Sequence, residues 1–261
     1  MILTYKGIKI NYNTCGNGST LVFLHGFLEN SEMWNSSVSF FSKYYNCVSI
    51  DLLGHGDSEN LGYIHTMEDM ATMVKAVLDK LQITKATFIG HSMGGYVALA
   101  TLDLFPEIVS GLVLLNSTSF PDSEERKITR TRAIEIVKKN PNAYTSMAIA
   151  NLFAPDNRDK FKEEISLIKN QASRTSLQGI ISALEGMKIR KDRVDTLTSF
   201  TGRKILMAGK LDPVLSYNQS EIEAVRCRID LVTFSGGHMT HIENEKRFLH
   251  ELNKFLSYSQ N

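Results

Sequence analysis

The chain has 261 residues, of which 43% are hydrophobic and 22% charged, and its formal net charge is +1. This length and composition predict one globular domain, or one domain with a large insertion, that buries a sizeable core. The charge gives no support for a nucleic-acid-binding protein, and no stretch approaches the ~18 apolar residues of a membrane span. Because the N-terminus also lacks the features of a signal peptide, we expect a cytoplasmic protein with neither nucleic acid nor membrane as a partner.

The cysteines are Cys15, Cys47 and Cys227. Their odd number and wide spacing argue against a disulfide framework or a zinc ribbon. Cys47 lies in an apolar run, so we expect it to be buried as a small hydrophobic side chain.

The expected elements alternate between strands and helices along most of the chain. The N-terminal residues 2–14 form two short runs around Gly7, which is typical of a hairpin at a sheet edge. Six short apolar or β-branched runs predict buried strands, and they lie at 21–24, 47–51, 86–90, 112–115, 205–208 and 231–234. Amphipathic patterns predict helices near 66–82, 93–105, 215–226 and 243–257. This alternation predicts an α/β fold with a mostly parallel central sheet and helices on both faces.

One region, residues 119–203, breaks this alternation. It contains only helix-like segments, with breaks at 140–141 and at Pro155. It holds 16 Lys and Arg against 11 Asp and Glu, a net charge of +5, whereas the remainder holds 13 against 17, a net charge of −4. We interpret 119–203 as a helical cap inserted into a core domain made of 1–118 and 204–261.

A motif of the form G-x-S-x-G occurs at residues 90–95, which read GHSMGG, between an expected strand and an expected helix. In this context Ser92 sits on a sharp turn, and the glycines are needed because larger side chains would clash with the neighbouring strand and helix. The helix N-terminus favours negative charge, and the backbone N–H of Met93 faces a developing oxyanion. The alternatives are a glycine-rich turn without chemistry and a phosphate-binding loop, whose own glycine patterns are absent.

A second oxyanion donor is expected where the strand at 21–24 ends in His25 and Gly26. The residue after this glycine is Phe27, and its backbone N–H is the expected partner of the Met93 N–H. We expect His25 to support the loop and not to act as a base.

The acid and the base are expected after Ser92, in the order Asp or Glu and then His. Asp212 directly follows one expected strand and His238 follows the next, at the strand ends where ligand sites of open α/β sheets gather. His241 is an alternative base, and Asp212 next to a proline is also typical of a surface turn. A metal site made of His238 and His241 is a further alternative, but Glu243 is not a clear third ligand for it.

Taken in order, these motifs resemble those of α/β-hydrolases with a helical cap, the group that includes carboxylesterases, enol-lactonases, C–C bond hydrolases and perhydrolases. The resemblance covers essentially the whole chain. It rests on residues 25–27 (HGF), 51–58 (DLLGHGDS), 90–95, 211–214 (LDPV) and 237–238 with Glu243. The chain departs from the family pattern at Glu245, where a proline is common, and this affects only the start of the last helix.

The resemblance implies the α/β-hydrolase fold, a catalytic triad of Ser92, Asp212 and His238, and an oxyanion hole formed by Phe27 and Met93. It also implies acyl transfer from a small-molecule ester to water through an acyl-enzyme, with no metal or organic cofactor. The serine nucleophile argues against a haloalkane dehalogenase or an epoxide hydrolase, which use an aspartate.

Two alternative functions and the substrate remain open. A C–C bond hydrolase or a lyase-type synthase of the menaquinone pathway could use the same triad, and a noncatalytic small-molecule receptor could share the fold. The first cap helix carries four basic residues that would either meet an anionic substrate or form a solvated face, namely Arg126, Lys127, Arg130 and Arg132. The adjacent Glu124 and Glu125 favour the solvated face.

Overall fold

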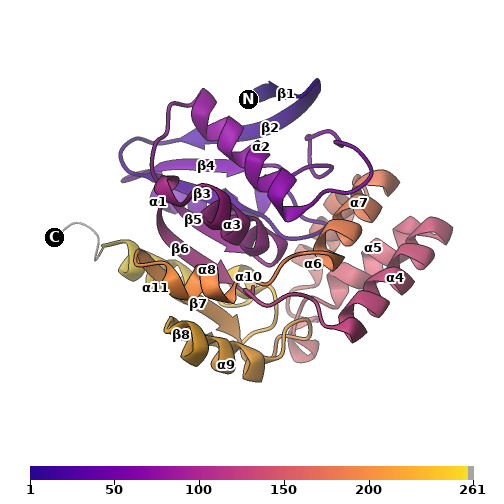
Figure 1. Ribbon diagram of the computed structural model, residues 1–261. Helices are drawn as coiled ribbons and strands as arrows, with labels where there is room; N and C mark the ends of the chain where they lie inside the picture. Colours follow the sequence, from indigo (N-terminus) through magenta and orange to yellow (C-terminus); the bar gives the residue numbers. More distant parts are fainter. Residues whose placement is uncertain (258–261) are drawn as a thin grey trace.

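The computed structural model describes residues 1–257, which form an eight-stranded sheet with helices on both faces (Figure 1). The strand order is β1-β2-β4-β3-β5-β6-β7-β8, and every pairing beyond β2·β4 is parallel. The strands are β1 (Ile2–Tyr5), β2 (Ile8–Cys15), β3 (Thr20–Leu24), β4 (Asn46–Ile50), β5 (Ala86–His91), β6 (Val109–Leu115), β7 (Arg203–Gly209) and β8 (Asp230–Phe234). The predicted α/β fold with a mostly parallel sheet is confirmed.

The edge of the sheet is the N-terminal hairpin of β1 and β2, as expected. Its turn consists of Lys6 and Gly7, which have φ values of 47° and 85°. Two successive residues with positive φ are typical of the tight turns whose twist matches that of a hairpin. β2 then pairs antiparallel with β4, with Tyr12 opposite Ile50.

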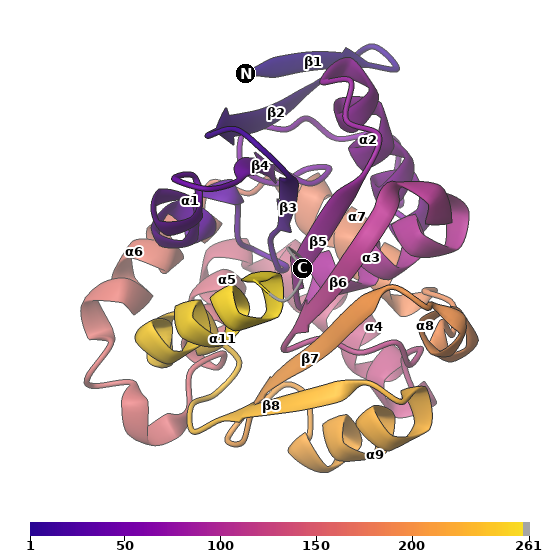
Figure 2. The ribbon, with the colours of Figure 1, turned by 90° about the vertical axis from the view of Figure 1, so that its left-hand side faces the viewer.

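Two layers of helices cover the sheet, because the buried strand side chains point alternately to its two faces. In β3, Val22 and Leu24 face one core cluster, whereas Leu21 and Phe23 face the other. One face is covered by α2 (Met67–Lys80), α3 (Met93–Leu104), α8 (Val194–Ser199) and α9 (Tyr217–Cys227), and the opposite face by α1 (Asn35–Phe41) and α11 (Glu245–Ser257), as Figure 2 shows.

The segment after β3 contains two short helices that sequence patterns did not predict. The 3-10 helix Ser31–Trp34 is capped by the Asn30 side chain, which accepts from the N–H of Glu32, and α1 follows it directly. α1 has only seven residues and is rich in Ser and Phe, which have modest helix propensity. It therefore displays too little of a 3.6-residue period to be recognised.

Between β6 and β7 the chain is helical and contains no strand. The helices are α4 (Glu124–Lys139), α5 (Pro141–Ala150), the 3-10 helix η3 (Pro155–Asn157), α6 (Lys162–Ala172), α7 (Leu177–Lys188) and α8. α4 contacts α5 and α7, and α5 contacts α6, whereas α8 contacts α3 and α9 (Figure 1). We propose that α4–α7 form the cap, and the boundaries 119–203 remain a prediction.

Cys47 and Cys227 are buried and Cys15 is exposed, and all three are free thiols. Burial of Cys47 in β4 agrees with its expected role as a small hydrophobic side chain. Within residues 1–257, no helix is both long enough and apolar enough to cross a membrane.

Candidate active site

The candidate site lies at the carboxyl ends of the strands, where the strand order reverses between β3 and β5. β3 is followed along the chain by β4 on one side, while β5 lies on its other side. Loops that leave two such strands diverge and open a crevice between them. The loop after β3 carries Phe27 and the turn after β5 carries Ser92, so the fold itself brings these two residues together.

Ser92 occupies the turn between β5 and α3 in a strained backbone conformation. Its φ of 49° and ψ of −113° lie in a region that side chains larger than glycine rarely adopt. Two hydrogen bonds hold Ser92 there. The Ser92 N–H donates to the Leu115 carbonyl (2.9 Å), and the Ser92 carbonyl accepts from the Ser117 hydroxyl (2.8 Å). Strain of this kind persists only where the surroundings determine the conformation.

The glycines of the turn are required by close backbone approach, as the motif suggested. A Cβ atom at Gly90 would collide with the backbone of Gly94 and Gly95. At Gly94 it would overlap the carbonyl of Leu24, and at Gly95 it would overlap the side chain of Ser117. The turn can therefore pack between β3 and β6 only with glycine at these positions.

His238 and Asp212 form a buried hydrogen-bonded pair. His238 Nδ1 lies 2.7 Å from Asp212 Oδ2, and the two side chains are 1% and 3% exposed. The other carboxylate oxygen accepts from the N–H groups of Val214 (2.7 Å) and Leu215 (2.9 Å). Burial acts to raise the pKa of Asp212, but the adjacent His238 and these hydrogen bonds outweigh it and hold that pKa below its ordinary value. An ionised Asp212 accepts a hydrogen bond from Nδ1 and leaves Nε2 as the ring nitrogen that it does not bind.

A further residue, Asn116, supports this pair and was not found from the sequence. It lies at the carboxyl end of β6, and its amide nitrogen donates to Asp212 Oδ2 (2.9 Å) and to the Gly237 carbonyl (3.2 Å). One side chain thus holds both the loop after β7 and the loop after β8. The sequence shows only that Asn116 is a polar residue directly after an apolar strand, and it does not indicate that Asp212 is its partner.

A second buried pair, Glu29 and His91, links the loop after β3, which carries Phe27, to His238. Glu29 Oε2 lies 2.7 Å from His91 Nδ1 and also accepts from the Gly26 N–H (2.7 Å). His91 Nε2 lies 2.9 Å from the carbonyl of His238. A ring that faces a carboxylate and a carbonyl must donate from both nitrogens, so His91 is an imidazolium.

The pKa shifts of Glu29 and His91 agree with this assignment. Burial acts against charge on both groups, raising the pKa of Glu29 and lowering that of His91. Their mutual attraction outweighs burial in each case, because the pKa of Glu29 falls to about 2 and that of His91 rises above its ordinary value. Both shifts therefore favour the ionised form of the pair.

The two residues expected to supply oxyanion donors lie beside Ser92, since Phe27 lines the same cavity and Met93 directly follows Ser92. The backbone N–H groups of Phe27 and Met93 donate to no acceptor within residues 1–257, so both are available to a ligand. His25 is engaged at both ring nitrogens: Nδ1 donates to the Gly26 carbonyl (2.7 Å), and Nε2 accepts from the Leu52 N–H (2.9 Å). Since burial lowers its pKa, His25 is a neutral support of the loop, as expected.

The alternatives built on His241 and Glu243 find no support in the geometry. His241 has no hydrogen-bond partner in the part of the chain that is described, and burial lowers its pKa to about 3. The Glu243 carboxylate accepts from the N–H of Gly237 (2.9 Å) and from the amide of Asn157 (2.6 Å), so protein donors already occupy it. Across residues 1–257, no group of three such side chains is arranged to hold a metal ion.

Glu243 instead connects the loop after β8 to the proposed cap. It contacts Gly237, directly before His238, and it also accepts from the side chain of Asn157 and the N–H of Ala154. The N–H of His238 donates in turn to the carbonyl of Leu152 (2.9 Å). The position of His238 therefore depends on the cap as well as on the sheet.

A cavity of about 80 Å³ contains both Ser92 and His238. A groove of about 530 Å³, lined mainly by residues of α4 and α5, adjoins it and shares part of its lining. Arg126 and Arg130 line both spaces, whereas Lys127 pairs with Glu124 at the exposed side of α4. The sequence favoured a solvent-exposed position for these basic residues, and this prediction holds for Lys127. It is wrong for Arg126 and Arg130, because the side of α4 that carries them faces the cavity and the groove.

Comparison with known proteins agrees with this architecture. The chain matches the model of the alpha/beta hydrolase fold family over residues 19–159. It is 25% identical over 253 residues to 3-oxoadipate enol-lactonase 2 of Acinetobacter baylyi, covering 95% of this chain and 93% of that protein. It is 26% identical over 248 residues to the putative carbamate hydrolase RutD of Pseudomonas syringae, covering 91% of this chain and 93% of that protein.

Solved structures share the fold over nearly the whole length. A thermophilic esterase from Thermogutta terrifontis superposes with a TM-score of 0.93 at 24% identity, covering 100% of this chain and 99% of that one. An enol-lactonase from Burkholderia xenovorans superposes with a TM-score of 0.91 at 21% identity, covering 98% and 100%. The protein therefore belongs to the alpha/beta hydrolase fold family and is an enzyme of the α/β-hydrolase type.

Proposed function

We propose that this enzyme is a serine hydrolase that cleaves an ester, or a related acyl bond, of a small molecule through Ser92, His238 and Asp212. One observation carries the proposal. His238, which is hydrogen-bonded to Asp212, lines the same cavity as the strained serine, and Asp212 leaves its other ring nitrogen for the nucleophile. A base that is oriented by a carboxylate and adjoins a serine on such a turn is the arrangement that nucleophilic catalysis requires.

In the first half of the proposed reaction, Ser92 Oγ attacks the substrate carbonyl while His238 Nε2 takes the hydroxyl proton. Asp212 stabilises the resulting imidazolium. The N–H groups of Phe27 and Met93 donate to the oxygen on which negative charge develops, and the loss of one such donor raises the barrier by about 3 kcal/mol in other hydrolases. Collapse of the intermediate breaks the bond to the leaving group, which takes the proton from His238.

In the second half, the acyl group remains on Ser92 as an ester until water attacks it. His238 takes a proton from this water, and the acid product leaves as Ser92 Oγ is reprotonated. The cycle consumes one water molecule per ester and restores every side chain.

The relatives support an ester as the substrate class. One is named as an enol-lactonase, and a lactone is a cyclic ester, while a protein of the same fold is described as an esterase. Both reactions place a carbonyl next to the nucleophile and release an oxygen leaving group.

The test is hydrolysis of p-nitrophenyl esters from acetyl to octanoyl by wild type, by Ser92→Ala and by the control Ser173→Ala. Ser173 is exposed at the C-terminal end of α6. We expect wild type and Ser173→Ala to turn over at the same rate, and Ser92→Ala to lose at least about 1,000-fold in kcat. Unchanged turnover by folded Ser92→Ala would contradict the proposed nucleophile. Absence of turnover by folded wild type on every ester would contradict the proposed substrate class.

A further inference from the structure

We infer that the substrate carries an anionic group, a carboxylate in the simplest case, which Arg126 and Arg158 bind in the groove beneath the cap. This inference rests on the proposed function, because it concerns the part of an ester that lies away from the bond that is cleaved.

The groove is positively charged. Arginines provide all of its charged side chains, and no Asp or Glu lines it. The arginines are Arg126, Arg130, Arg132 and Arg158. The remaining walls are mostly apolar, and they are formed by Phe27, Ala133, Ile136, Tyr144, Met147, Ala148, Leu152, Leu184, Pro213 and Val214. An apolar groove whose charges are all of one sign suits a ligand with a hydrocarbon chain and an opposite charge.

Not all four arginines are available, because one is already neutralised. Arg130 forms an ion pair with Asp122, a buried carboxylate that also pairs with Arg190. Arg132 is exposed at the rim of the groove. This leaves Arg126 and Arg158 as the partly buried cations of the groove.

Arg126 and Arg158 have unused donors. The only side-chain hydrogen bond of Arg126 to the described residues runs from Nη1 to the Val214 carbonyl (2.9 Å), and a carbonyl does not neutralise its charge. The Nε of Arg158 is buried and has no hydrogen-bond partner within residues 1–257. A guanidinium offers five N–H donors in a fork that matches a carboxylate, and a buried donor without a partner is destabilising. An anion in the groove would satisfy both residues.

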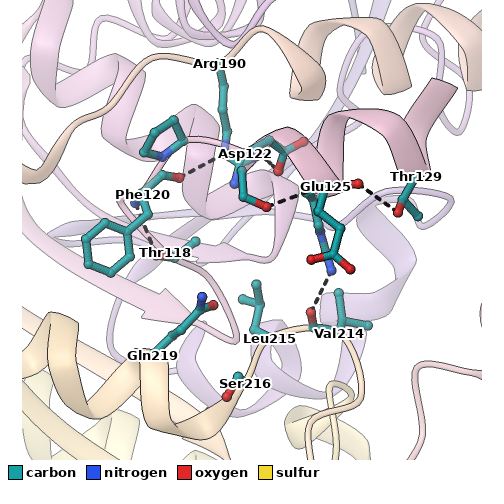
Figure 3. Close-up of a pocket in the computed structure, with 13 residues that line it drawn as sticks. Thr118, Phe120, Asp122, Glu125, Thr129, Arg190, Val214, Leu215, Ser216 and Gln219 are labelled. Atoms are coloured by element: carbon teal, nitrogen blue, oxygen red, sulfur yellow. Dashed lines mark hydrogen bonds and ion pairs between the residues drawn. The ribbon is translucent and has the colours of Figure 1, made fainter.

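A neighbouring pocket of about 350 Å³ provides a contrast (Figure 3). It lies between the start of α4 and the loop after β7, where Val214 and Leu215 face Asp122 and Glu125 in Figure 3. Two carboxylates and two arginines line this pocket, so its charges balance, whereas no carboxylate lines the groove. Arg126 borders both spaces, so an anion is favoured on its groove side.

The groove adjoins the cavity of Ser92, because five residues line both. These are Phe27, Arg126, Arg130, Leu152 and Val214. One substrate can therefore place its carbonyl at Ser92, extend an apolar chain past Leu152 and reach the cap arginines with its far end. A half-ester of a dicarboxylic acid and a lactone that carries a carboxylate both have this form.

The experiment compares two nearly isosteric esters, the mono-p-nitrophenyl ester of adipic acid and its primary amide, with the enzyme-free rates subtracted. We expect wild type to favour the acid over the amide by about 10- to 100-fold in kcat/KM, the range of one charge-assisted hydrogen bond. Arg126→Gln and Arg158→Gln should each lower this acid-to-amide ratio by about tenfold or more. Arg174→Gln removes the same charge from an exposed site in the cap outside the groove, and it should leave the ratio unchanged.

Each outcome distinguishes the anion site from the proposed function. If wild type cleaves both esters equally, or if the ratio is the same in Arg126→Gln and Arg158→Gln as in wild type, the anion site is refuted while the ester hydrolase remains. If wild type cleaves neither ester and a fluorophosphonate leaves Ser92 unmodified, the proposed function fails and the anion site fails with it.

Discussion

Replacement of Glu29 by glutamine tests whether the buried ion pair of Glu29 and His91 holds the loop after β3, which carries Phe27, in place. The Glu29 carboxylate binds the Gly26 N–H and the His91 ring, and the other nitrogen of that ring donates to the carbonyl of His238. The substitution keeps the size of the side chain but removes its charge. His91 then loses the partner that keeps it protonated, so its bond to His238 weakens as well.

The size of the effect follows from the pKa of Glu29. A decrease from 4.5 to about 2 corresponds to about 3 kcal/mol of stability at neutral pH, since one pKa unit is worth about 1.4 kcal/mol. This is an upper limit for Glu29→Gln, because the amide oxygen still accepts one hydrogen bond, and we expect a loss of about 2 kcal/mol. The pKa of the folded state is the lower one, so the stabilisation is complete above pH 4.5 and is lost as the pH falls toward 2. The difference between wild type and variant should shrink accordingly below pH 4.5.

Urea unfolding gives the stability of Glu29→Gln, and p-nitrophenyl ester hydrolysis gives its kcat and KM. We expect kcat to fall about tenfold with little change in KM, because the loop that carries the Phe27 N–H is displaced. Glu221→Gln is the matched control, since Glu221 is exposed on α9 and has no ion pair within residues 1–257. If Glu29→Gln matches Glu221→Gln in both stability and kcat, the pair has no role in holding the loop.

Two further predictions concern the acid and the buried histidines. Asn116→Ala removes a hydrogen bond to ionised Asp212, so we expect kcat/KM to fall about 10- to 100-fold in the ester assay while the fold is retained. Unchanged kinetics would contradict the supporting role of Asn116. His55 and His241 have pKa values lowered by burial to about 3, below their ordinary value of 6.5. Between pH 6.5 and 3 the unfolded state therefore binds more protons than the folded state. As the pH falls from 7 to 5, each of these two histidines should lower the free energy of unfolding, measured in urea titrations, by about 2 kcal/mol. His91, whose pKa is raised, acts in the opposite sense. A free energy of unfolding that does not change over this range would contradict the burial of two neutral rings.

Much of the fold was predictable, because its elements have strong local signals. The six buried strands are short apolar runs that end in turn residues, and all six lie within two or three residues of their expected bounds. The edge hairpin follows from Gly7 and its flanking runs. The helix α1 was missed because seven residues carry too weak a period, and its position is set by packing of Phe41 against the sheet.

The positions of Ser92, Asp212 and His238 were predictable because each directly follows a strand, and parallel strands present their carboxyl ends at one edge of the sheet. Their supporting residues were not. Asn116 and Glu29 act through partners that are distant along the chain, and no local pattern identifies such partners. The triad roles of these residues remain predictions.

The cap illustrates a different limit. Its helices were predicted from composition and spacing, but the orientation of α4 was not, because its charged residues surround the helix on all sides. Only the fold separates Lys127, paired on the outside, from Arg126, which faces the nucleophile cavity. The orientation of α4 therefore depends on packing that sequence periodicity does not reveal.

The most direct test of the central claim is mass spectrometry of the protein after reaction with a fluorophosphonate. Such a reagent phosphonylates a serine only where a base activates it and where donors stabilise the developing charge. We predict one adduct per chain, on the peptide that contains Ser92, which is absent from Ser92→Ala and strongly reduced in His238→Ala. A folded wild-type protein that forms no adduct, or one that is modified at another residue, would contradict the account.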